Sequence, residues 1–214
     1  MGGRAGGGAS GGIGSRSGGG GMSARAQSLA KQYLGDIKDP TLRKELAEGM
    51  AAFEKEFGIP VFGNGDGRGG LKITMSDLGE TTTGKVNGMG YLEINSRFTT
   101  GQLPMSHAKH TMIHELTHGL DKTNAFNLTN GEWSSKGGGK FVVKKENKGF
   151  DRKLTAAYKA FKKNYGSAQT KQIGSYALKS KHEFFAESLA KHMTGTKNSY
   201  TTFAYNLAKS MSGK

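Results

Sequence analysis

Apolar residues recur at helical spacing in the stretch DPTLRKELAEGMAAFEKEFG, between Asp39 and Gly58. The apolar stripe consists of Leu42, Leu46, Met50, Phe53 and Phe57. Asp39 is a favourable N-cap, Pro40 fits the first helical position, and Gly58 fits the position that ends a helix. The pattern predicts an amphipathic helix here, with a shorter one before it in SARAQSLAKQYLGD.

Three short stretches then have the composition of strands: LKITM, KV and GYLEI, separated by glycine-rich turns. We expect them to form a small antiparallel sheet. The stretch GYLEINSRF is the predicted edge strand, to which an extended peptide could add through main-chain hydrogen bonds.

Helical periodicity returns from about Ser106, a suitable N-cap, to about Lys122. The buried side of this helix is predicted to consist of Met112, Ile113, Leu116 and Leu120. Later helices are predicted at about residues 151–165, with Leu154, Tyr158, Phe161 and Tyr165 at helical spacing, in SKHEFFAESLAKHM, and in SYTTFAYNLAKSM. Helices around a small sheet indicate an α+β fold.

The first 22 residues contain 12 glycines, together with serines, alanines and two arginines. They hold too few apolar groups to offset the entropy of ordering the chain, so residues 1–22 are predicted to be a flexible tail or linker. Residues 23–214 suffice for one hydrophobic core and are predicted to form a single domain.

The chain contains no cysteine. Disulfide frameworks, thiolate metal sites and cysteine nucleophiles are therefore excluded, and any metal ion must be held by His, Asp or Glu. The N-terminal stretch MGGRAGGGAS lacks the apolar region of a signal peptide, and no segment approaches the roughly 20 apolar residues that cross a bilayer. We expect a soluble protein, cytoplasmic, virion-associated or delivered without a classical export signal.

The helix from Ser106 carries the sequence His-Glu-Leu-Thr-His at residues 114–118. Imidazoles four residues apart lie one above the other on a helix, so His114 and His118 can both bind one tetrahedral ion. Glu115 is placed beside that ion, where its carboxylate can take a proton from a metal-activated water. We therefore predict two metal ligands and a general base.

The same helix also carries His107 and His110, so a surface cluster of histidines is the structural alternative. A metal site built on His110 and His114 is less favourable, because Thr111 would then stand where the base is needed.

A catalytic zinc site needs a third protein ligand. Asp121, one turn past His118, is one candidate. Glu183 is the better one, because Glu183 and Glu187 lie four residues apart on one helix face and suit one ligand and one carboxylate that orients an imidazole. Ser180-Lys-His-Glu183 also matches a helix capping box, which is the alternative role for Glu183.

HELTHGLD followed by GSYALKSKHEFFAESLAKHM resembles the catalytic domain of anthrax lethal factor and its relatives, a zincin family, over about residues 85–205. The resemblance implies that Glu183 is the third zinc ligand. It implies that Glu187 contacts the ligand side chains without binding the ion itself. It also implies that Tyr176 stabilises the oxyanion or assists the leaving group; from the residues alone, Tyr176 is a loop tyrosine. Similar domains occur in phage head proteins and bacterial toxins, which implies such a setting.

The chain carries 31 Lys and Arg against 17 Asp and Glu, a net charge of +14. Between Lys136 and Lys181 there are 13 basic residues and two acidic ones, Glu146 and Asp151. Such a field attracts acidic proteins or nucleic acid, whereas a solvated face kept for solubility is the alternative. Because the toxin cleaves basic peptide tails, its substrate preference does not transfer to this basic chain.

These patterns together predict a zincin-like endopeptidase that uses one catalytic Zn²⁺ to hydrolyse a protein or peptide substrate. A different class stays open: a basic virion or nucleic-acid-binding protein with a structural zinc site. Closed structural sites use four protein ligands, whereas three good ones are found here beside an activating glutamate, which favours the enzyme.

Overall fold

The computed structural model describes residues 21–60, 71–86, 91–128 and 148–212. In chain order the elements are α1 (Ala24–Tyr33), α2 (Pro40–Phe57), β1 (Lys72–Ser76), β2 (Gly84–Val86), β3 (Tyr91–Asn95), the 3-10 turns η1 (Ser96–Phe98) and η2 (Met105–His107), α3 (Ala108–Leu128), α4 (Lys148–Lys163), α5 (Ala168–Ile173), the 3-10 turn η4 (Ser175–Leu178), α6 (Lys181–Met193) and α7 (Ser199–Ser212). Residues 1–20 lie outside the described ranges, so the flexible tail stays a prediction.

Helix α2 begins and ends where its sequence predicts. The Asp39 side chain accepts a hydrogen bond from the Leu42 amide at 2.8 Å, which satisfies one of the amide groups left open at a helix start. Gly58 ends the helix with φ +78°, a conformation that favours glycine. The predicted apolar stripe is buried: Leu42, Leu46, Met50, Phe53 and Phe57.

The sheet is mixed, with strand order β1-β3-β2, so the prediction of an antiparallel sheet is wrong. Strand β1 pairs parallel to β3, whereas β2 pairs antiparallel to it. The predicted edge strand, β3, is the central one, with Leu92 and Ile94 fully buried. The edge position next to α3 belongs instead to the three-residue strand β2, as is usual for short strands.

One asparagine fixes the connection that leads into β2. Asn95, which ends β3, is fully buried and donates from Nδ2 to the carbonyl oxygens of Gly79 and Thr82 at 2.7 and 2.6 Å. Its main-chain amide donates to the Thr83 carbonyl at 3.0 Å. These bonds hold the residues just before Gly84 against the end of the central strand.

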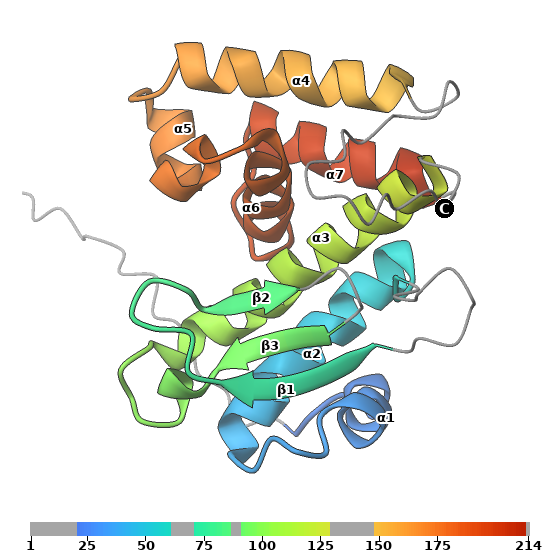
Figure 1. Ribbon diagram of the computed structural model, residues 1–214, viewed down its shortest axis with the longest axis vertical. Coiled ribbons are helices and arrows are strands. Elements are labelled where there is room, and N and C mark those ends of the chain that lie inside the picture. The colour runs from blue at the N-terminus through green and yellow to red at the C-terminus, as the bar shows by residue number, and fades with distance from the viewer. Residues whose placement is uncertain (1–20, 61–70, 87–90, 129–147, 213–214) are drawn as a thin grey trace, which may run out of the picture.

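Helix α3 runs through the middle of the molecule, with the sheet and α2 on one side and α4 to α7 on the other (Figure 1). Its predicted apolar side is buried: Met112, Ile113, Leu116 and Leu120. It extends to Leu128 rather than Lys122, and the predicted N-cap, Ser106, lies within η2. A Cβ atom at Gly49 of α2 would lie 2.9 Å from the Lys109 carbonyl oxygen, so this glycine permits close packing of the two helices.

Three of the C-terminal helices, α4, α6 and α7, contribute to an aromatic cluster. The Phe161 ring of α4 lies 4.9 Å from that of Phe184 in α6, and both rings contact Tyr200 of α7. Helix α4 ends at Lys163 rather than at about residue 165, so Tyr165 lies beyond the helix and is 40% exposed. The described helices include none that is long and apolar enough to cross a membrane.

Candidate metal centre

The packing of α6 against α3 brings together side chains that are about 70 residues apart in the chain. His114 and His118 come from α3, and Glu183 and Glu187 from α6. The Ser180 side chain caps α6 by accepting a hydrogen bond from the Glu183 amide at 3.1 Å, which is one half of the predicted capping box. The Glu183 carboxylate lies against the imidazoles of His114 and His118, where a metal ligand is expected.

Three ligand atoms form a nearly regular triangle. His114 Nε2 lies 3.1 Å from His118 Nε2 and 3.1 Å from Glu183 Oε2, and His118 Nε2 lies 3.3 Å from the same carboxylate oxygen. A tetrahedral zinc ion with bonds of about 2.0 to 2.1 Å has neighbouring ligand atoms about 3.3 Å apart. The donor set therefore fits one face of a zinc tetrahedron and leaves the fourth corner for a ligand from outside this group of three.

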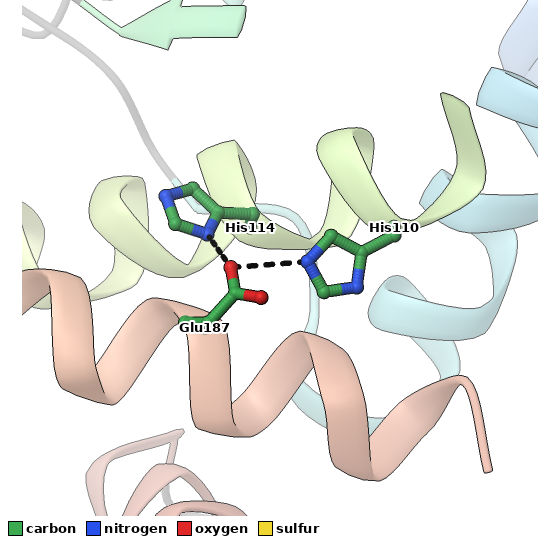
Figure 2. Close-up of side chains that lie close together, drawn as sticks. All are labelled: His110, His114 and Glu187. Atoms are coloured by element: carbon green, nitrogen blue, oxygen red, sulfur yellow. Dashed lines mark hydrogen bonds and ion pairs between the residues drawn. The ribbon is translucent and has the colours of Figure 1, made fainter. Parts of the chain in front are cut away.

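Glu187 holds the other side of the His114 ring. Its Oε2 atom lies 3.2 Å from His114 Nδ1 and 3.1 Å from His110 Nε2, between the two rings (Figure 2). A carboxylate at Nδ1 favours the tautomer with the proton on that nitrogen, which leaves Nε2 with the lone pair that a metal ion needs. The Glu187 carboxylate thus suits the orienting role expected of it.

The cluster is a strongly coupled set of charges. Burial would by itself lower the pKa of His114, but hydrogen bonds with Glu183 and Glu187 outweigh it and raise the pKa to about 10. For Glu183 and Glu187, burial would raise the pKa, yet bonds with the histidines lower it, in Glu187 to about 2. A cation is therefore favoured at this position, and a metal ion that enters must displace the His114 proton.

A second group of ligand atoms shares His114. Within the described residues, His110, His114 and Glu187 also place ligand atoms within 4.8 Å of one another. The two groups use opposite nitrogens of one ring, so a neutral His114 can serve only one of them. The group with Glu183 has the neighbouring Glu115, whereas the group with Glu187 has Thr111, which cannot act as a base at neutral pH.

Glu115 is buried, with 5% of its surface exposed, and it lies against the edge strand. A Cβ atom placed on Gly84 of β2 would stand 2.9 Å from Glu115 Cγ and 3.2 Å from its Oε1. It would also lie 2.9 Å from Thr111 Cγ2. The missing side chain at Gly84 is therefore what allows the Glu115 carboxylate to lie beside β2.

Tyr176 lies in η4, next to the ligand atoms. Its ring centroid is 5.9 Å from that of His114, edge to face, and 37% of the residue is exposed. Burial of the hydroxyl, together with the nearby carboxylates, raises its pKa to about 12, so the hydroxyl keeps its proton at neutral pH. Lys179 Nζ lies 3.9 Å from the centroid of the same ring.

Asp121, the other candidate ligand, is engaged elsewhere. Its Oδ2 atom pairs with Nδ1 of His182, the residue before Glu183. The roles of His110 and Gly84 were not predicted, because their partners come from other elements. The only signal in the sequence for His110 was its place one turn before His114, on the same helix face.

A comparison with known families gives the class of protein to which the chain belongs. The model of the glucose-regulated metallopeptidase family M90 matches residues 73–194, more than half of the chain. That range contains β2, the HELTH helix and all of α6. No curated protein and no solved structure matches the chain. From the family match, the chain belongs to the glucose-regulated metallopeptidases of family M90.

Proposed function

We propose that the chain is a zinc-dependent endopeptidase whose ion is held by His114, His118 and Glu183. The observation that carries this proposal is the triangle of ligand atoms, with sides of 3.1, 3.1 and 3.3 Å, beside the buried Glu115. Family membership supports a metallopeptidase and disfavours the alternative of a non-enzymatic virion or nucleic-acid-binding protein. When bound, zinc supplies Lewis-acid chemistry, which acidifies water and polarises a carbonyl group.

Three side chains of the protein have distinct roles in the remaining steps of hydrolysis. Glu115 takes a proton from the attacking water and passes it to the amide nitrogen as the C–N bond breaks. Tyr176, whose hydroxyl stays protonated, donates a hydrogen bond to the oxyanion that develops on the carbonyl oxygen. Glu187 keeps His114 in the orientation and tautomer that binding requires.

The edge strand supplies a way to hold the substrate. Strand β2 is the last strand of the sheet on the side of α3, and its Gly84 lies against Glu115. An extended peptide that pairs with β2 would bring its main chain beside the general base. This role belongs to β2, because β3 is the central strand.

Association with phage particles or with toxin delivery remains a proposal that rests on resemblance alone. The family match supports neither a phage nor a toxin association, and it does not support the substrate specificity of lethal factor.

The two overlapping ligand groups are two possible positions for the ion, and each position predicts different effects of mutation on zinc affinity. His118→Ala should abolish tight zinc binding, because it removes a direct ligand, whereas His110→Ala should weaken it by about 10- to 100-fold, as loss of an orienting group does. Competition with a chelating dye measures both, with circular dichroism as the check on folding. The reverse order of effects would place the ion between His110, His114 and Glu187.

Replacement of the general base should separate zinc binding from catalysis. Glu115→Gln keeps the ligand triangle but removes the proton acceptor, so zinc affinity should persist while peptide hydrolysis falls by about 10²- to 10⁴-fold. Mass spectrometry of new termini across a peptide library measures the hydrolysis, with Asp36→Asn, in the turn between α1 and α2, as control. A Glu115→Gln protein that cuts peptides at the wild-type rate would refute the assignment.

Loss of the tyrosine hydroxyl should act on the chemical step. Tyr176→Phe preserves the ring that packs on His114 and removes the oxyanion donor, so kcat should fall by about 10²- to 10³-fold with KM nearly unchanged. Steady-state kinetics on one cleaved peptide tests this. An unchanged kcat would show that Tyr176 is a packing residue.

A methyl group at the edge strand should misplace the base without removing it. Gly84→Ala pushes a Cβ into Glu115, so kcat should fall at least about 10-fold while zinc affinity stays close to the wild-type value. Gly35→Ala is the matched control, because nothing lies within 4 Å of a Cβ built there. Equal kcat values for the two variants would mean that Glu115 does not depend on the space at Gly84.

A further inference from the structure

Exposed basic side chains recur on α4, on α5 and at the residue that follows η4. Between residues 152 and 179 the chain has no Asp or Glu. All of its basic residues in that range are exposed: Arg152, Lys153, Lys159, Lys162, Lys163, Lys171 and Lys179. We call these seven residues the basic strip.

Helix α4 is built to present this charge outward. Leu154 and Phe161 face the core, and the Phe161 ring packs on Phe184 of α6. Lys159 and Lys163 are one turn apart on the opposite, exposed face. The packing of α4 therefore fixes the cations in place on a rigid element.

The basic strip continues to the metal centre through a series of contacts. Lys162 Nζ lies 5.4 Å from the centroid of the Tyr158 ring, and the Tyr158 hydroxyl donates to the Leu178 carbonyl at 2.6 Å. Leu178 precedes Lys179, whose ammonium lies over the Tyr176 ring. Tyr176 in turn contacts His114. Lys179, one member of the basic strip, therefore lies beside the proposed metal centre.

The charge of the basic strip is not neutralised within the described residues. No described carboxylate lies within 4.0 Å of the nitrogen atoms of its seven members. Asp151, the acidic residue just before the strip, is paired with Lys181 of α6. The cation–π partners of Lys162 and Lys179, Tyr158 and Tyr176, are aromatic rings and not carboxylates. The positive field is therefore available to a partner.

We propose that the basic strip binds an acidic segment of the protein substrate and steers the neighbouring peptide bond into the site. This inference rests on the proposed function, because it takes the occupant of the metal centre to be a polypeptide. The metal centre beside Lys179 belongs to a metallopeptidase, so the molecule that enters it is a polypeptide, and an acidic stretch of that polypeptide has the charge that complements the seven cations. An acidic polypeptide therefore fits better than a nucleic acid.

The test uses two peptide libraries with the same randomised core. One carries a tail of aspartates and the other a tail of asparagines, placed at either end. Zinc-loaded wild type should cleave the aspartate library about three- to tenfold faster at low salt, and the preference should vanish near 1 M salt, where the Debye length is about 3 Å.

Two double variants locate the effect. Lys162→Gln with Lys163→Gln removes two cations from the last turn of α4 and should reduce the preference while leaving cleavage of the asparagine library unchanged. Lys31→Gln with Lys55→Gln removes two cations from the last turns of α1 and α2, at equal cost in net charge, and should keep the preference. Equal loss in both variants would mean a general effect of net charge and would overturn the proposal.

Other outcomes are also decisive. Equal cleavage of both libraries by wild type would overturn the role of the basic strip while leaving the peptidase intact. If neither library is cut by zinc-bound protein, the proposed function fails. Fluorescence anisotropy then compares the affinity of the protein for a labelled aspartate-rich peptide with its affinity for a single-stranded oligonucleotide of equal charge. Tighter binding of the oligonucleotide, sensitive to Lys162→Gln with Lys163→Gln, would overturn the acidic polypeptide as occupant.

Discussion

The packing of α6 against α3 is the constraint on which the rest of the molecule depends. It brings the buried His114 into contact with two partly buried glutamates, so that His114 lies between Glu183 and Glu187. Removing one partner from a buried charge cluster typically costs about 3 to 5 kcal/mol, because the remaining charge is left uncompensated. The fully buried Phe184 and Phe185, next to Glu183 in α6, supply apolar contacts that hold the helix in place while the charges meet.

The sheet matters because it acts on the same helix from the other side. Asn95 fixes the residues before β2, and β2 then places Gly84 against Glu115. Helix α6 therefore positions the metal ligands and strand β2 positions the general base, although His114, Glu115 and His118 all lie on α3. This division explains why a substitution at Gly84 can disturb the base and spare the ligands.

Local features of the fold could be predicted from the sequence, and long-range ones could not. Helix α2 could be predicted because Asp39, Pro40 and Gly58 determine its two ends through local interactions. The metal-binding role of His114 and His118 could be predicted because residues four apart lie on one face of a helix. Neither composition nor turn residues encode which strand lies between the other two, which is why the prediction of β3 as an edge strand is wrong. His110 meets Glu187 only after α6 has packed, 77 residues later in the chain.

The most direct measurement of the central claim is anomalous diffraction at the zinc absorption edge from crystals of the zinc-loaded protein. A single strong peak within bonding distance of His114 Nε2, His118 Nε2 and a Glu183 carboxylate oxygen, with Glu187 left as the partner of His114 Nδ1, is the result predicted here. A peak between His110, His114 Nδ1 and Glu187 would contradict the account, because the ion would then lie away from the nitrogen that faces His118 and Glu183.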